Sequence, residues 1–175
     1  MFKILVEGCT PTRGSKYSAC IDLYSSEDVV IGAGETKLVG LGVCIDIYKL
    51  YTALTEVGVD DSTMLIKKVN AFKSKHYLQL MLRSSLGKKG LILPNGVGVI
   101  DLDYKDEIKM IIHRPSHRRV VDDNDFPSDY LCSNYDFNIQ KGDRIAQITL
   151  LEHKGYLMGI ESDAERAGGF GSTGE

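Results

Sequence analysis

Short apolar segments separated by turn residues constrain the fold of this chain most strongly. They are rich in β-branched and other apolar residues, and we expect strands at Phe2–Val6, Val29–Ile31, Thr36–Val39, Val43–Ile47, Met64–Val69, Tyr77–Leu82, Glu107–Ile112 and Arg144–Leu151. Turn signals separate them, for example Gly32–Gly34, Pro94–Gly96 and Lys141–Asp143. One further segment, Tyr48–Val57, suggests a short helix. Many short strands divided by turns are typical of an all-β sandwich or barrel-like sheet.

The length of 175 residues fits one domain with its own hydrophobic core, so residues 1–175 are treated as a single unit. Two stretches interrupt the strand pattern, Lys49–Asp61 and His113–Asn138, and both are interpreted as insertions. Long surface loops cost little closure entropy and often carry specificity or partner contacts. The insertions are therefore either neutral surface excursions or sites of contact with a regulatory protein.

The charge distribution argues against polyanionic partners. A formal net charge of −3 gives little attraction toward nucleic acid or an anionic membrane surface. The densest basic cluster, His113–Arg119, is followed directly by Asp122, Asp123 and Asp125, which suits a solvated loop better than a grip on a phosphate backbone. We therefore predict no stable nucleic-acid binding.

The apolar and cysteine patterns indicate an intracellular protein. Met1–Val6 lacks the features of a signal peptide, and no segment approaches the ~20 apolar residues of a membrane span. No C-x-x-C spacing suits zinc or redox chemistry, so reduced thiols are expected at Cys9, Cys20, Cys44 and Cys132. We expect no membrane partner and a cytoplasmic location, in the host cell if the chain is encoded by a virus or phage.

A candidate phosphate-binding turn follows the strand that ends at Leu82. The hydroxyls of Ser84 and Ser85 and the guanidinium of Arg83 suit phosphate oxygens, as do backbone N–H groups in such a turn. The spacing of a Walker-type loop is absent. A plain surface turn is the alternative interpretation of this segment alone.

The segment Asn95–Glu107 carries residues that suit a pyrimidine nucleotide. Asp101 follows an extended apolar passage, where a carboxylate is partly desolvated and acts as a general base toward water. Asn95 offers an amide that both donates and accepts, as the edge of uracil or cytosine requires. Tyr104 presents a flat face to a sugar. The alternative is that Asp101 and Asp103 only form turns.

Gln147 is the odd polar residue within an apolar strand. A side-chain amide on a mostly buried strand requires a hydrogen-bond partner. A phosphate at the sheet edge and a structural hydrogen bond both meet this requirement, and the sequence leaves the choice open.

The tail Arg166–Gly174 contains four glycines around one aromatic residue. Such a segment cannot build a core, but it suits a flexible arm that closes over a ligand. In this interpretation Phe170 stacks on a base. Arg166, Ser172 and Thr173 then reach phosphates, whereas a disordered terminus is the alternative.

Together with Ser18–Leu23, these segments resemble the five motifs of the trimeric dUTP diphosphatase (dUTPase) family. The resemblance runs from about Ala19 to Gly174, and its most specific parts are Arg83–Ser85, Gly98–Asp101 and Gly169–Gly174. It implies an all-β, distorted jelly-roll fold of the β-clip type, assembled as a homotrimer. It also implies that the C-terminal arm, residues 162–175, is exchanged between subunits, so that each site combines motifs from several chains.

The resemblance implies a hydrolase of nucleotide metabolism that converts dUTP to dUMP and pyrophosphate by water attack on the α-phosphorus, with Mg²⁺ as cofactor. This reaction limits uracil in DNA and supplies dUMP for thymidylate synthesis. Asp101 is the implied general base, and Asp22 the implied contact to metal-bound water. The implied substrate-binding residues are Arg83, Ser84, Ser85, Asn95, Gly98, Tyr104, Gln147, Arg166, Phe170, Gly171, Ser172 and Thr173. Among them, Asn95 matches the uracil-reading position and Tyr104 the one that packs against deoxyribose.

Some positions depart from the family pattern. Cys20 stands where glycine is usual, Leu82 where proline is usual, and Asp106 where glycine is common. Arg166 lies one residue nearer Phe170 than is usual, which weakens its assignment to a phosphate.

Two alternatives to dUTP hydrolysis remain. A dCTP deaminase, or a bifunctional relative, shares the Arg-Ser-Ser-Leu segment that resembles Arg83–Leu86, but it needs a proton-shuttling glutamate that the strand after Glu107 lacks. The other alternative is a regulatory binding protein on the dUTPase scaffold, which contacts its partner through the insertions.

Overall fold

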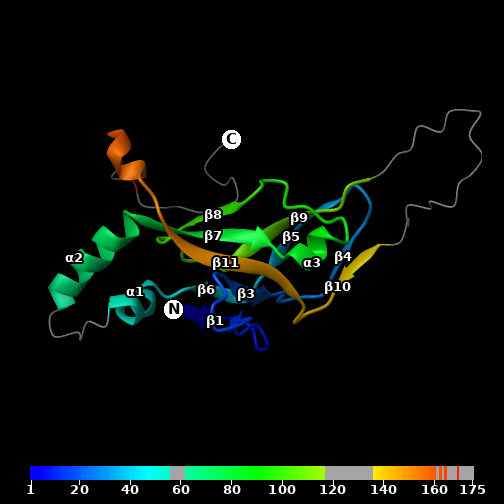
Figure 1. The fold of residues 1–175 in the computed structure, drawn as a ribbon, viewed down its shortest axis with the longest axis horizontal. Coiled ribbons are helices and arrows are strands. Elements are labelled where there is room, and N and C mark those ends of the chain that lie inside the picture. Colours follow the sequence, from blue (N-terminus) through cyan, green and yellow to red (C-terminus); the bar gives the residue numbers. More distant parts are fainter. Residues whose placement is uncertain (56–61, 117–135, 161, 163, 165–168, 170–175) are drawn as a thin grey trace, which may run out of the picture.

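The computed structural model describes residues 1–55, 62–116, 136–160, 162, 164 and 169. Its strands are β1 (Phe2–Ile4), β2 (Thr12–Arg13), β3 (Ile21–Tyr24), β4 (Val29–Ile31), β5 (Thr36–Gly40), β6 (Val43–Ile45), β7 (His76–Leu82), β8 (Gly98–Asp101), β9 (Lys109–His113), β10 (Phe137–Ile139) and β11 (Arg144–Glu152). Its helices are α1 (Ile47–Thr55), α2 (Ser62–Lys73), α3 (Ser84–Gly87) and the 3₁₀ helix η1 (Gly155–Met158). Strands form most of the framework, as predicted (Figure 1).

An antiparallel sheet of five strands, in the order β2-β3-β11-β7-β8, organises the molecule. The remaining strands form the antiparallel pairs β1–β6, β4–β10 and β5–β9. The long strand β11 crosses the middle of the sheet, with α1 and α2 beyond one end and β4 and β10 at the other (Figure 1). The sheet therefore connects distant parts of the sequence, and its register decides which side chains can meet.

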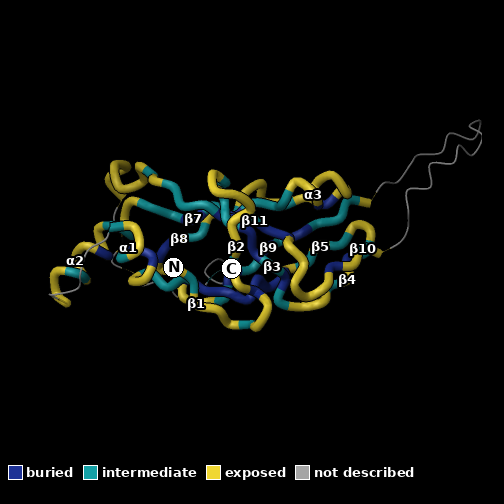
Figure 2. The backbone as a smooth tube through the Cα atoms, turned by 60° about the horizontal axis from the view of Figure 1, so that its bottom comes forward, coloured by how far each residue is buried: buried dark blue, intermediate teal, exposed yellow. Residues whose placement is uncertain are grey.

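The core lies between one face of the five-stranded sheet and the strand pairs. Figure 2 shows buried segments running through the middle of the molecule, with exposed turns around them. The largest fully buried side chains are Leu23, Ile31, Leu41, Leu50, Leu80, Leu91, Ile108, Met110, Ile112, Ile139, Ile145 and Ile148. All are aliphatic or methionine, so the core gains its stability from apolar burial.

The prediction of a strand at Met64–Val69 is wrong, because these residues lie within helix α2. Its β-branched residues favoured a strand, but the buried positions follow a helical spacing. Val69 is buried and Phe72, three residues later, packs against the core, whereas Met64 and Ile66 are exposed. Tertiary packing of one helical face overrides the local strand preference.

The other predicted strands are confirmed, and their ends differ from the prediction by two residues at most. The short helix expected at Tyr48–Val57 is confirmed as α1. Residues 49–55 of the first predicted insertion belong to this helix, and 56–61 lie outside the described residues. Most of the second, His113–Asn138, also lies outside them, as does most of the arm 162–175.

Candidate active site

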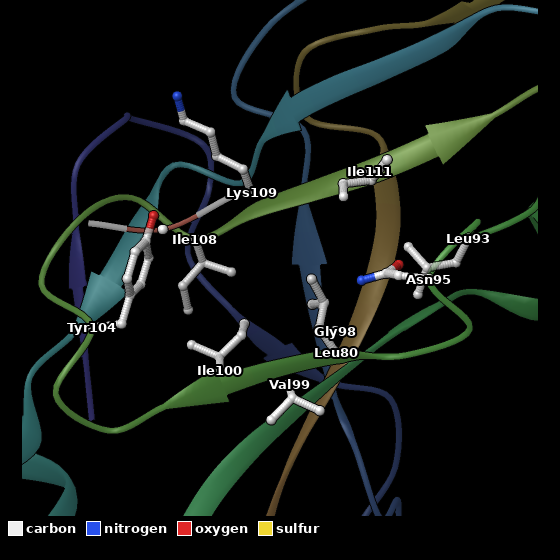
Figure 3. Close-up of a pocket in the computed structure, with 11 residues that line it drawn as sticks. Leu80, Leu93, Asn95, Gly98, Val99, Ile100, Tyr104, Ile108, Lys109 and Ile111 are labelled. Carbon is white, nitrogen blue, oxygen red and sulfur yellow. The ribbon is translucent and has the colours of Figure 1, made fainter. Parts of the chain in front are cut away.

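An apolar pocket of about 480 Å³ opens beside strand β8. Its lining residues are Leu80, Leu93, Asn95, Gly98, Val99, Ile100, Tyr104, Ile108, Lys109, Ile111 and Gly169. Figure 3 shows Asn95 and Tyr104 on opposite sides of it, with Ile100 and Ile108 between them. The structure thus brings together the residues predicted to contact the base and the sugar.

Local backbone geometry places Asn95 and Gly98 at this pocket. The turn before β8 needs glycine at position 96, because the φ angle there is +73°. The N–H of Gly96 donates to the carbonyl of Leu93 at 2.9 Å, which closes the turn around Asn95. At Gly98 a Cβ atom would lie 3.0 Å from Cβ of Leu80, so glycine lets β8 approach β7 closely.

Tyr104 is held firmly in the wall of the apolar pocket. Its ring is buried, and its hydroxyl donates to the backbone carbonyl of Glu107 at 3.1 Å. The Glu107 carboxylate in turn accepts from the N–H of Gly42 at 2.7 Å and from the hydroxyl of Ser26 at 3.1 Å. Gly169 of the tail packs against the same ring, since a Cβ at that position would lie 2.8 Å from Cε2 of Tyr104. Glu107 therefore holds the hydroxyl end of the Tyr104 ring, and Gly169 packs against its Cε2 edge.

A second pocket, the arginine pocket, has a volume of about 320 Å³. It is lined by Gly14, Ser18, Ala19, Cys20, Asp22, Arg83, Arg144 and Gln147. The buried Asp22 carboxylate lies at its centre, with Oδ1 3.1 Å from Nε of Arg83 and Oδ2 3.3 Å from a terminal guanidinium nitrogen of Arg144. Nε2 of Gln147 also donates to Oδ1 at 3.3 Å. The amide of Gln147 thus has a structural partner, one of the two alternatives that its sequence context left open.

Charge attraction dominates the contact between Arg83 and Asp22. The buried Nε–H of Arg83 has no aligned hydrogen-bond acceptor, although the carboxylate lies within ion-pair distance. One terminal nitrogen of Arg83 donates instead to the carbonyl of Arg144 at 3.4 Å. Ser84 and Ser85 are exposed at the start of the short helix α3 that follows. The predicted phosphate-binding turn therefore lies at the rim of the arginine pocket.

Asp101 lies at the end of β8, opposite Tyr77 of β7. The prediction that its carboxylate is partly desolvated is wrong for the single chain, in which Asp101 is exposed. The physical reason is that β8 is the edge strand of the described sheet, so no described strand pairs with its outer side. Asp101 follows an apolar passage in sequence, but those apolar residues do not surround its side chain.

The sheet register separates Asp101 from the arginine pocket. Asp22, Gln147 and Met81 form one cross-strand row, and Tyr77 and Asp101 form another. The rows are four residues apart along β7, and Asp22 and Asp101 are three strands apart. Strand spacings of ~4.8 Å and a rise of ~3.3 Å per residue then place their Cα atoms on the order of 20 Å apart on the same sheet face. One chain therefore does not bring Asp101 to the arginine pocket.

Arg144, Ser18 and Lys109 line these pockets but were missed by the sequence reasoning. For Arg144 the strand pattern offered no signal, because residues three apart on a regular strand point to opposite faces and Arg144 reaches the side of Gln147 only through a register shift. Of the predicted site residues, those that lie outside the described part of the chain are Arg166, Phe170, Gly171, Ser172 and Thr173.

The described side chains suit a Mg²⁺ ion that is bound mainly through substrate phosphates better than one that is bound by protein ligands alone. Within residues 1–55, 62–116, 136–160, 162, 164 and 169, no three His, Cys, Asp or Glu side chains gather to hold a metal. Mg²⁺ keeps several waters and usually takes one or two carboxylates together with substrate phosphates. The single carboxylate of Asp22 fits that pattern, and the guanidinium groups of Arg83 and Arg144 lie beside it.

The cysteines that the structure describes carry free thiols, as expected. Cys9, Cys20 and Cys44 are free thiols, and Cys132 lies outside the described residues. Burial raises the pKa of the Cys9 thiol, whose Sγ lies 3.5 Å from the carbonyl oxygen of Ser25. None of the helices that the structure describes is long and apolar enough to cross a membrane.

The fold and the two pockets described above define the class of the protein: a β-rich fold with an apolar pocket that contains Asn95 and Tyr104 and an arginine-lined pocket around Asp22. No protein-family model matches the chain. It is 33% identical over 178 residues to deoxyuridine 5'-triphosphate nucleotidohydrolase of Nautilia profundicola, covering 99% of this chain and 96% of the relative. The enzyme of the same name from Paramecium bursaria Chlorella virus 1 is 30% identical, covering 98% of this chain and 94% of the relative. The chain belongs to the dUTPase family, as the motifs predicted.

Solved structures support the same fold. The dUTPase of Streptococcus mutans has a TM-score of 0.56 at 23% identity, covering 86% of this chain and 94% of that one. A dUTPase from phage phi11 of S. aureus has a TM-score of 0.59 at 18% identity and covers 98% of both chains. The phage structure is described as revealing the coordination of a structural Mg(II) ion. The likeness confirms the predicted all-β, distorted jelly-roll fold.

Proposed function

We propose that this chain hydrolyses dUTP to dUMP and pyrophosphate. The observation that carries the proposal is the pairing of an apolar pocket, which holds Asn95 and Tyr104, with an arginine pocket around Asp22. The first suits a pyrimidine deoxynucleoside and the second suits phosphates. The named activity of relatives that match nearly the whole chain supports the same reaction.

In this proposal, the apolar pocket recognises the base and the sugar of the substrate. Asn95 presents both a donor and an acceptor, which match the edge of uracil. The buried ring of Tyr104 forms a flat wall of this pocket, and we propose that it excludes a ribose 2′-hydroxyl. Phe170 is proposed to stack on the base from the tail, and Gly98 to let the nucleoside approach the backbone.

Asp101 is proposed to accept the proton of the attacking water. The water oxygen forms a bond to the α-phosphorus, the bond to the bridging oxygen of the β-phosphate breaks, and pyrophosphate leaves with that oxygen. Such a transfer depends mainly on positioning and charge neutralisation. The guanidinium of Arg83, the hydroxyls of Ser84 and Ser85, and the amide of Gln147 are proposed to hold the phosphates.

Tail residues complete the proposed phosphate site. Gly171 and the hydroxyls of Ser172 and Thr173 are proposed to close over the phosphates, with Arg166 as a further cation. Asp22 is proposed to hold a water of Mg²⁺ bound to the triphosphate. The metal, when bound, neutralises phosphate charge during the displacement.

We further propose that the enzyme is a homotrimer with shared sites, acting on the cytoplasmic nucleotide pool. The support is the separation, on the order of 20 Å, between Asp101 and Asp22 within one chain. A neighbouring subunit that presents its Asp101 to the arginine pocket overcomes this separation and also desolvates the carboxylate. In the single chain, Gly169 lies against its own Tyr104, and arm exchange replaces this contact by the equivalent one from another subunit.

The test is a substrate panel of dUTP, dCTP, dTTP and UTP with Mg²⁺, in which pyrophosphate and ammonia are both measured. Pyrophosphate from dUTP alone is expected, and ammonia from dCTP would instead identify a deaminase. Asp101→Asn is expected to lower kcat by a factor on the order of 10²–10⁴ while dUTP still binds. Asp103→Asn, two residues away, is the matched control and should keep most activity; an unchanged kcat in Asp101→Asn contradicts the proposed base.

A further inference from the structure

Arg144 occupies a position that the motif assignments leave without a role. It is the first residue of β11, and its side chain is about half exposed at the arginine pocket. Arg144 and Arg83 each lie next to a different oxygen of the Asp22 carboxylate. One buried carboxylate therefore holds two guanidinium groups side by side.

A β-bulge explains how Arg144 reaches this pocket. Residues three apart on a regular strand point to opposite faces, so Arg144 and Gln147 would not both face Asp22. The pairing of β11 with β3 shifts register between Arg144 and Ala146, which inserts one residue into the ladder. Bulges re-aim side chains and recur beside active sites. Here the shift lets Arg144 and Gln147 contact the same carboxylate.

The charges of the arginine pocket favour an anion. Its lining residues contain two guanidinium groups against one carboxylate, and the other side chains are uncharged. A carboxylate shared between two arginines satisfies only part of the donor fork of each group. A polyphosphate with several charged oxygens matches those donors better than Asp22 alone.

We propose that Arg144 is a second phosphate-binding guanidinium, held by Asp22 until the phosphates of the substrate replace that carboxylate. The inference rests on the proposed dUTP hydrolysis, because the phosphate is taken to be that of dUTP. Asp22 acts as a positioning residue for both arginines in the ligand-free protein. Substrate binding exchanges the ion pairs with Asp22 for bidentate contacts to phosphate, which frees the carboxylate oxygens of Asp22; these oxygens would then be available to a water of Mg²⁺ if the metal is bound.

Metal-free binding of pyrophosphate, measured by titration calorimetry, tests the role of Arg144 without turnover. Arg144→Gln is expected to weaken pyrophosphate binding at least about tenfold, since it removes a charge-assisted bidentate contact. Arg144→Lys should restore the affinity only in part, because an ammonium is a point charge. Lys141→Gln, an exposed neighbour that loses the same charge, is the control and should stay within about twofold of wild type. Pyrophosphate binding by a folded Arg144→Gln within about twofold of wild type overturns the proposal.

The Asp22→Asn variant tests whether Asp22 holds the two arginines in place of phosphate or has a purely structural role. If Asp22 competes with phosphate for the arginines, its removal tightens metal-free pyrophosphate binding several-fold. Unchanged or weaker binding, in a variant with a wild-type thermal unfolding profile, overturns that part.

Steady-state kinetics distinguish this inference from the proposed function. Arg144→Gln should raise KM for dUTP while inhibition by deoxyuridine, which has no phosphate, stays the same. A wild-type protein that releases no pyrophosphate from dUTP refutes the proposed function. A wild-type enzyme that hydrolyses dUTP, beside an Arg144→Gln variant with unchanged KM and pyrophosphate affinity, refutes only the role of Arg144.

Discussion

Gly169 lies so close to the ring of Tyr104 that a Cβ atom at Gly169 would stand 2.8 Å from Cε2 of the tyrosine. Real Cβ atoms essentially never approach another atom so closely, so any side chain there must displace the tail or the ring. The ring is fixed by its hydrogen bond to Glu107, which leaves the tail to move. The contact therefore ties the position of the tail to the wall of the apolar pocket.

Gly169→Ala should weaken closure of the tail over the substrate. Overpacking of this kind costs about 1–3 kcal/mol, which corresponds to a rise in KM for dUTP of roughly 5- to 100-fold. Thermal unfolding should change little, because Gly169 is not one of the buried residues of the core. Ala164→Ser, at an exposed position of the same tail, is the control and should keep the wild-type KM. An unchanged KM in Gly169→Ala would show that the contact is not used when substrate is bound.

Two substitutions separate the ring of Tyr104 from its hydroxyl. Tyr104→Phe removes the hydrogen bond to the Glu107 carbonyl, and its expected loss is about 1 kcal/mol of unfolding free energy, or about 2–4 °C in Tm. Because the ring remains, the ratio of kcat/KM for dUTP over UTP should persist. Tyr104→Leu keeps an apolar side chain but removes the flat wall, and this ratio should fall at least about tenfold. Equal selectivity in both variants would contradict the sugar-excluding role.

The sequence predicts those parts of the molecule that depend on local pattern. Alternation and turn residues located most of the strands, and Asn95 and Tyr104 were expected near one ligand because both belong to one segment. The helix α2 was mistaken for a strand, since its β-branched residues favour strands and only tertiary packing reveals the helical face.

Nonlocal geometry explains what the sequence did not predict. The contact of Arg144 with Asp22 depends on a register shift between β11 and β3, and no local pattern predicts such a shift. The exposure of Asp101 follows from the position of β8 at the sheet edge, which is a property of strand order. Motif spacing identified Asp101 and Asp22 as candidates, but only the register reveals their separation.

Leu50 joins helix α1 to the core, although the helix lies beyond the end of the sheet. Its side chain is 1% exposed and belongs to the core cluster, whereas Leu54 on the same helix is 49% exposed. Leu50→Ala should lower the free energy of unfolding by about 2–5 kcal/mol. Leu54→Ala, the same truncation at an exposed site, should cost less than half as much. Chemical denaturation measures both, and equal losses would contradict the packing of α1 through Leu50.

Thiol labelling reports on the two environments of the cysteines. Cys9 is fully buried, and its raised pKa means that it remains protonated at a pH at which an exposed thiol begins to ionise. In a Cys132→Ser background at pH 8, we therefore expect Cys20, which lines the arginine pocket, to react first with a disulfide reagent. Cys9 and Cys44 should react only after unfolding. Pyrophosphate should slow the labelling of Cys20, and faster labelling of Cys9 than of Cys20 would contradict the burial of Cys9.

Subunit mixing tests whether the active site is shared between chains. Asp101→Asn and Arg83→Ala should each be nearly inactive, because each removes one half of the proposed site. After refolding together in equal amounts, random trimers should recover about one quarter of the wild-type activity if Asp101 and Arg83 of one site come from different chains. The reason is that a chain with intact Asp101 can then lie beside a chain with intact Arg83.

Arg83→Ala mixed with Gln147→Ala is the matched control. Both residues line the arginine pocket of one chain, so no mixture supplies them together and no activity should return. Light scattering must show a trimer mass in both mixtures, and tags of different mass on the two variants must show that mixed trimers form. An inactive mixture of Asp101→Asn and Arg83→Ala, in trimers shown to be mixed, would place both residues of each site on one chain. The separation of Asp101 from the arginine pocket in the sheet register predicts the opposite result.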